Sequence, residues 1–84
     1  MKIHELKTRE SFFLAICERE KRFEIRNNDR GFKVNDLLVL REWTGSRYTG
    51  NVITAKVIYM TDFEQKPGFV VMGIDIIDVQ IVTE

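Results

Sequence analysis

The sequence has one cysteine, one proline and one histidine, and its thirteen basic residues are balanced by thirteen acidic ones. A lone Cys17 excludes an intrachain disulfide framework. Cys17 and His4 also lack partners at the spacings of zinc-binding motifs, and no glycine-rich phosphate loop occurs, so we expect neither a metal nor a cofactor. A net charge of zero indicates no basic nucleic-acid-binding tail, so any charge argument has to be local.

Long hydrophobic segments are missing as well. The longest nearly apolar run, residues 69–77, includes Gly73 and Asp75 and is far shorter than the ~20 residues that a membrane-spanning helix needs. Residues 1–10 lack the apolar stretch of a secretory signal. We therefore expect no membrane segment and a cytoplasmic location, and 84 residues suit a single domain spanning 1–84.

One principal helix is predicted near the N-terminus. Apolar residues at helical spacing place it at 9–18, and Thr8 can serve as its N-cap. The same spacing predicts that Phe12, Phe13 and Ile16 lie in the core.

The rest of the chain has the pattern of short strands. Alternation of apolar and polar residues predicts strands at 2–6, 22–26, 37–43, 52–61, 69–77 and 79–82. Turn residues at 44–50 and 62–67 indicate hairpin connections. The expected class is α+β, with five or six strands in a small sheet or partly closed barrel, and a parallel βαβ sheet fits this pattern poorly.

The strand predicted after the helix carries the local charge. Arg22, Glu24 and Arg26 occupy alternate positions and leave one face, while Phe23 and Ile25 form the apolar face of a half-buried strand. One interpretation of this row is a solvated strand face with self-neutralising ion pairs, which are common and contribute little to stability. A functional alternative is that the carboxylate orients a guanidinium toward a phosphate or a base edge.

The surrounding residues favour the functional alternative. Residues 19–33 contain six basic and three acidic side chains, the most electropositive segment of the chain. In this interpretation Arg26 contacts phosphate or a base edge, Glu24 holds Arg26 or accepts a hydrogen bond from a base amino group, and Lys21 contacts phosphate. The same interpretation puts Arg30 and Lys33 at the rim of this binding site.

Other polar and aromatic residues have weaker signals. Trp43 and Tyr48 lie close to Arg41 and could stack on bases, although a lone Trp at a strand end is more often packed. An isolated His4 is usually structural or solvent-facing, and Cys17 on the apolar side of the helix is expected to behave as a small hydrophobe.

Five separated motifs, at 4–7, 21–26, 28–32, 34–40 and 68–74, follow one another in an order typical of a known family. Together they resemble the ASCH domain, named for activating signal cointegrator homology and related to PUA domains. The similarity is greater to short bacterial and phage ASCH-like proteins of unknown function, and it covers nearly the whole chain.

The resemblance implies a PUA-like β-barrel with a helix at its side and a cleft lined by Lys21, Glu24 and Arg26. It also implies RNA or a nucleotide-like ligand as the partner. Two positions depart from the pattern, because Arg19 and Asn35 stand where relatives usually have glycine. Asn is the non-glycine residue best able to adopt a left-handed conformation, so we expect the turn at Asn35 to persist.

Two other functions stay open at this point. Some ASCH relatives are amidohydrolases that remove an acyl group from a modified cytidine with a Lys, Thr and Glu set. Lys21 matches that lysine, but Glu24 stands where such enzymes carry the threonine, so the proposed nucleophile is missing. A protein-interaction module is the third alternative, because the family name comes from a transcription cofactor and the chain has no net charge.

Overall fold

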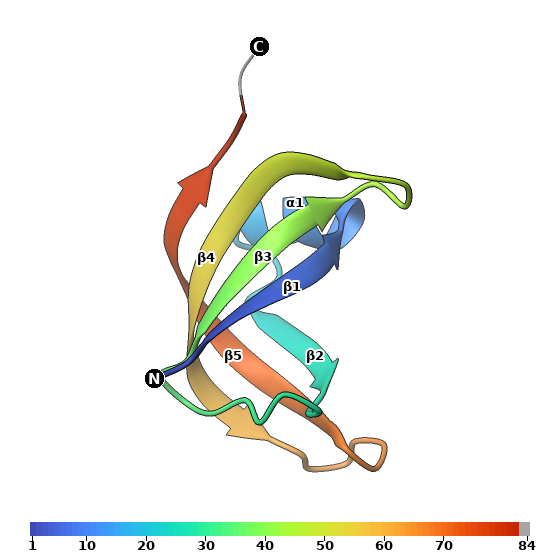
Figure 1. The fold of residues 1–84 in the computed structure, drawn as a ribbon. Helices are drawn as coiled ribbons and strands as arrows, with labels where there is room; N and C mark the ends of the chain where they lie inside the picture. The colour runs from blue at the N-terminus through green and yellow to red at the C-terminus, as the bar shows by residue number, and fades with distance from the viewer. Residues whose placement is uncertain (83–84) are drawn as a thin grey trace.

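The computed structural model describes residues 1–82, which form one strongly bent five-stranded sheet with a single short helix (Figure 1). The elements, in chain order, are β1 (Ile3–Arg9), α1 (Glu10–Cys17), β2 (Phe23–Asn27), β3 (Leu37–Trp43), β4 (Tyr48–Thr61) and β5 (Phe69–Gln80). The strand order is β1-β3-β4-β5-β2. An α+β class with one helix near the N-terminus and a partly closed, barrel-like sheet is therefore confirmed.

Strand pairing corrects two sequence predictions. β5 runs on to Gln80, because Val79 pairs with Ile53 and Gln80 with Val52 in the β4–β5 ladder, so the separate strand predicted at 79–82 is wrong. The hairpins β3–β4 and β4–β5 are present as expected. β1, however, pairs with β3 in parallel, and alternation within a strand cannot reveal its partner.

The helix begins later than predicted, and Thr8 does not cap it. β1 continues to Arg9 because its ladder with β3 extends as far as Trp43. Thr8 is therefore a strand residue whose side chain is buried on the inner face of the sheet, and Arg9 stands at the N-cap without a side-chain cap hydrogen bond. Among residues 1–82, no helix is long and apolar enough to cross a membrane.

The core lies between the inner face of the sheet and one side of α1. Its members are Leu6, Phe13, Ile16, Phe32, Leu38, Leu40, Ile53, Ala55, Val57, Val70, Met72 and Ile74. Phe12 was predicted to join them but is 45% exposed. The helix has only 8 residues and buries Phe13 and Ile16, so Phe12 is left on its flank.

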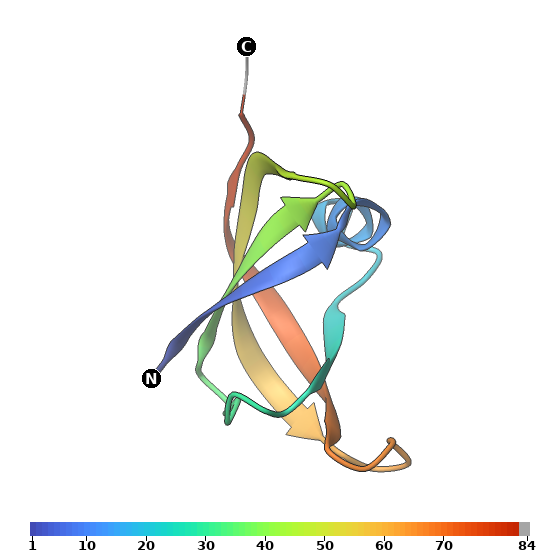
Figure 2. The same cartoon turned by 45° about the vertical axis from the view of Figure 1, so that its right-hand side comes forward.

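The bend of the sheet brings its two edge strands toward each other. The β4–β5 ladder shifts register twice, between Thr54 and Ala55 and between Val57 and Tyr59, and such irregularities bend a strand and increase its twist. In Figure 2 the two edge strands, β1 and β2, face each other across an opening between their backbones, with α1 at its upper end. β1 and β2 are the two edges of the sheet.

Candidate functional site

Glu24 is the centre of the charged cluster in this opening. Its side chain points to the inner side of β2 and the residue is only 3% exposed. One carboxylate oxygen accepts a hydrogen bond from Lys21 Nζ at 2.8 Å, and the other accepts one from Arg26 Nε at 2.9 Å. The structure therefore brings together Lys21, Glu24 and Arg26, as the sequence predicted.

The orientation of β2 is the reverse of the sequence prediction. Phe23 and Ile25, expected on the buried face, are 41% and 50% exposed, whereas Glu24 is buried. A carboxylate can be buried here because two cations pair with it, which offsets the loss of solvation. Arg22 precedes β2 and leaves the row, because its Nε donates to the carbonyl oxygen of Arg19 at 3.0 Å.

Two arginines bridge the gap between the sheet edges. Arg26 Nη2 donates to the carbonyl oxygen of Lys7 on β1 at 3.0 Å and lies 3.5 Å from Thr8 Oγ1. Arg30 Nη1 donates to the carbonyl oxygen of Glu5 at 2.7 Å. These carbonyls lie on the edge of β1 that faces away from β3, so guanidinium groups take the place of a neighbouring strand.

Lys21 lies where the chain leaves α1. Its ammonium group donates to the carbonyl oxygen of Phe23 at 2.6 Å as well as to Glu24, and its side chain is 15% exposed. The ring centroids of Phe12 and Phe23 lie 5.2 Å and 4.8 Å from Nζ. Aromatic faces attract a cation at these distances, so the two rings help to fix the ammonium group.

The turn before Lys21 contains a residue in a left-handed conformation. Arg19 has a φ of 62° at the position where helices usually end on glycine. Backbone hydrogen bonds from Arg19 N to Ile16 O and from Glu20 N to Ala15 O close the helix end. Asn35, the second departure from glycine, has a φ of 80°, so the predicted turn is confirmed there.

The cluster carries a surplus of charge and unused donors. Lys21 and Arg26 bring two positive charges against the single negative charge of Glu24. An ammonium group has three donors, and acceptors within residues 1–82 engage two of them at Lys21. No acceptor in this part of the chain engages Arg26 Nη1. The arrangement can therefore hold an anion.

Arg30 and Lys33 contact other parts of the chain than Glu24. Arg30 is exposed and donates to a carbonyl of β1 two residues before the carbonyl that Arg26 contacts. Lys33 lies in the loop between β2 and β3, where its backbone N–H donates to Asp36 Oδ2 at 3.0 Å and its side chain is exposed. The structure therefore ties Arg30 to the same edge of β1 as Arg26, and no hydrogen bond within residues 1–82 links Lys33 to the cluster.

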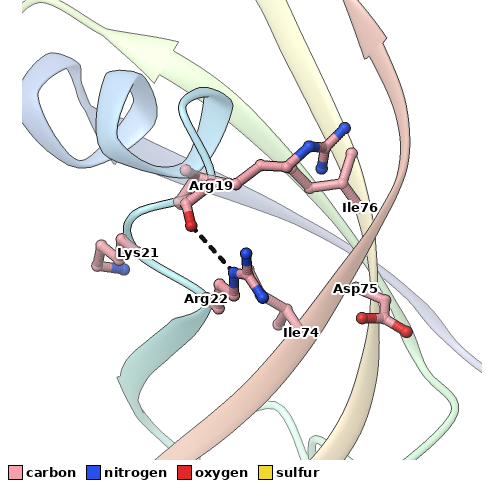
Figure 3. A pocket seen from close by; sticks show the side chains of 7 residues that line it. Arg19, Lys21, Arg22, Ile74, Asp75 and Ile76 are labelled. Atoms are coloured by element: carbon pink, nitrogen blue, oxygen red, sulfur yellow. Dashed lines mark hydrogen bonds between the residues drawn. The ribbon is translucent and has the colours of Figure 1, made fainter.

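A separate hollow of about 200 Å³, which includes Lys21 but neither Glu24 nor Arg26, lies between the end of α1 and β5 (Figure 3). Arg19 and Arg22 extend along it, and Asp75 lies at its far side. Ile74 and Ile76 of β5 complete its lining, together with Ile16. No local sequence pattern groups Arg19 with β5, because the two are distant along the chain.

The aromatic residues at the end of β3 pack against each other. The rings of Trp43 and Tyr48 meet edge to face with centroids 4.9 Å apart. Lys7 Nζ lies 4.1 Å from the Trp43 ring centroid, and the Arg41 guanidinium lies 3.9 Å from that of Tyr48. Both rings therefore already interact with cations of the chain itself.

A second buried carboxylate, Asp36, lies at the opposite end of β1. It accepts hydrogen bonds from the backbone N–H groups of Lys2 and Lys33 at 3.0 Å each and pairs with His4 Nε2 at 2.8 Å. Burial by itself raises the pKa of Asp36, but these hydrogen bonds outweigh it and lower the pKa to about 2. His4 therefore has the structural role expected of an isolated histidine.

Cys17 packs against the core, as expected. Burial raises the pKa of its thiol, and the nearby carboxylates of Glu42 and Glu18 raise it further. A raised pKa keeps the thiol protonated and disfavours its reaction as a nucleophile.

The fold and the cluster define a small protein with a bent sheet whose open edge is bridged by arginines around a buried glutamate. The chain belongs to the family described as "Domain of unknown function (DUF3850)", whose model matches residues 3–74. It is also 38% identical over 61 residues to a protein of Escherichia phage P2 described as "Uncharacterized 12.9 kDa protein in GpA 3'region". That match covers 73% of this chain and 56% of the phage protein, little more than half of its length.

Proposed function

We propose that the chain is an ASCH-type, PUA-like module of the cytoplasm that binds RNA, or a nucleotide portion of it, at the cluster formed by Lys21, Glu24 and Arg26. The observation that carries this proposal is the surplus positive charge of the cluster beside a buried carboxylate. Phosphate is the anionic group that an arginine fork and an ammonium group recognise together.

Each residue has a distinct role in this proposal. The bond from Arg26 Nε to Glu24 orients the guanidinium and leaves Nη1 for a phosphate oxygen or a base edge. Lys21 directs its remaining donor to phosphate. Arg30 and Lys33 add positive charge along the rim, where charge attracts a polyanion without reading its sequence.

The hydrolase alternative has less support from the geometry. Both oxygens of Glu24 are held by cations, so this carboxylate is poorly suited to take a proton from water. Lys21 donates to the same carboxylate at 2.8 Å and to the carbonyl oxygen of Phe23 at 2.6 Å, so its ammonium group is engaged as a donor and not aimed at a substrate as a base. If the purified protein released cytidine from an acylated cytidine, the hydrolase would be preferred over the RNA-binding module.

The test is binding of the purified protein to short RNA and DNA oligonucleotides across a series of salt concentrations. Wild-type protein is compared with Lys21→Ala and Arg26→Ala, and with Lys56→Ala and Arg47→Ala as matched controls at exposed positions. We expect saturable RNA binding that weakens as the salt concentration rises and that weakens with each of the two cluster substitutions. Each substitution should also lower the salt slope, the change in log binding constant per change in log salt concentration, by the amount that one phosphate contact contributes. Equal binding by Arg26→Ala and Arg47→Ala would overturn the role of the cluster.

A further inference from the structure

An apolar hollow of about 450 Å³ lies beside the charged cluster, between α1 and β2. Its walls are Phe12 and Ala15 from the helix and Phe23 and Ile25 from the strand. Both phenylalanines are more than 40% exposed. Rings at these positions contribute little to the core, and the hollow falls within the size range of ligand pockets, roughly 300 to 1,000 Å³.

Lys21 joins this hollow to the charged cluster. The residue lines the hollow, and its ammonium group lies near both rings while donating to Glu24 at 2.8 Å. A ligand that meets the remaining donor of Lys21 with an anionic group therefore has an aromatic surface directly beside that group. Glu20 adds a single carboxylate at the border of the hollow.

We infer that this hollow is a stacking site for an unpaired nucleobase, so that the ligand of the proposed site is single-stranded RNA. The inference rests on the proposed function, because it takes the phosphate of the same nucleotide to lie at Lys21 and Arg26. Aromatic rings next to a positively charged groove are the combination with which proteins bind single strands. Bases of a duplex are stacked inside their helix and cannot reach Phe12 and Phe23.

The test compares short oligoadenylate, the same backbone without bases, and a duplex of oligoadenylate with oligouridylate. Phe12→Ala and Phe23→Ala should each bind oligoadenylate about 5- to 150-fold more weakly than wild type, the range that base–aromatic stacking supports. Their salt slope should equal that of wild type, because no charge is removed. Phe63→Ala is the matched control, since that ring is 74% exposed in the loop between β4 and β5.

Two comparisons separate stacking from a structural effect. Phe23→Tyr keeps the ring and should bind like wild type, whereas Phe23→Leu keeps only apolar volume and should bind like Phe23→Ala. On the backbone without bases, all variants should bind equally. If Phe12→Ala and Phe23→Ala lost as much affinity for the backbone without bases as for oligoadenylate, the stacking site would be wrong. It would also be wrong if wild type bound the duplex as tightly as the single strand.

The outcome for wild type distinguishes this inference from the function on which it rests. If wild type binds oligoadenylate and the phenylalanine variants bind it equally well, the stacking site is wrong and the phosphate site stands. If wild type binds no oligonucleotide at low salt, the proposed function fails together with the inference. Capture of a protein partner that Phe23→Ala abolishes, with no binding to RNA, would assign the apolar surface to protein recognition.

Discussion

Two buried carboxylates, Glu24 and Asp36, lie near opposite ends of β1, and each is 3% exposed. Asp36 is held by two backbone N–H groups, each of which has a single proton, and by the buried His4. Glu24 is held by two long cationic side chains that retain unused donors and a surplus charge. The two carboxylates are therefore equally buried, and they differ in the groups that hold them. Fixed backbone donors make Asp36 an anchor of the fold, whereas long cationic side chains make Glu24 the centre of a candidate binding site.

The largest effect is expected when the anchor is removed. Asp36→Ala leaves the N–H groups of Lys2 and Lys33 without their acceptor and His4 without its partner. The free energy of unfolding should fall by about 3 to 5 kcal/mol, the usual cost of breaking a buried polar pair. Urea denaturation measures this loss, and Asp78→Ala on the exposed part of β5 should change it by less than about 0.5 kcal/mol.

The second prediction uses acid to weaken the same anchor without mutation. Because folding lowers the pKa of Asp36 from 3.8 to about 2, its ionised form stabilises the fold above pH 4, and this contribution is lost as the pH falls from about 4 to about 2. The lost free energy is about 2 kcal/mol. Urea denaturation of wild type and Asp36→Asn should show their difference shrink by this amount in acid, and a constant difference would contradict the assignment.

The third prediction sets the Glu24 cluster apart from the anchor. Glu24→Gln should lower the free energy of unfolding by about 1 to 2 kcal/mol, because hydrogen bonds to charged groups weaken. Binding of RNA should not weaken, because removing one negative charge leaves two uncompensated cations. Fluorescence anisotropy at fixed salt checks this against Arg26→Ala, which should bind less tightly; equal losses in the two variants would mean that binding depends on the Glu24 carboxylate holding Arg26 and not on the surplus charge.

The smallest effect is expected at the turn that leads to Lys21. Arg19→Gly should raise the free energy of unfolding by about 0.5 to 1 kcal/mol, because glycine accepts the φ of 62° without strain. Thermal denaturation measures the gain, and Arg19→Ala removes the same side chain while keeping the strain. If Arg19→Gly and Arg19→Ala raised the free energy of unfolding equally, the cause would be the loss of the arginine charge and not the relief of backbone strain.

Much of the cluster could be predicted from the sequence. Lys21, Glu24 and Arg26 are close along the chain, and a strand places alternate side chains on one face, so their convergence needs only local geometry. Thr8 was missed because its sequence context suits a helix cap, while the β1–β3 ladder makes it a strand residue beside Arg26. No local signal distinguishes these two outcomes.

Phe12 and Phe23 were assigned to the inside by the same rule that places apolar residues in a core. That rule fails where a buried charged cluster takes the inner face, because the alternate positions of β2 must then point outward. The charged motif directly beside two phenylalanines was the available signal. It becomes informative only once Glu24 is known to be buried.

The sequence by itself determined the class of fold, the hairpins, the helix near the N-terminus and the charged segment, because each follows from periodicity and turn residues over a few positions. Only the tertiary structure decided that β1 pairs with β3 and that the sheet bends until Arg26 and Arg30 reach the free carbonyls of β1. It also decided which face of β2 is buried. These features depend on contacts between residues far apart in the chain, and a local pattern carries no information about such partners.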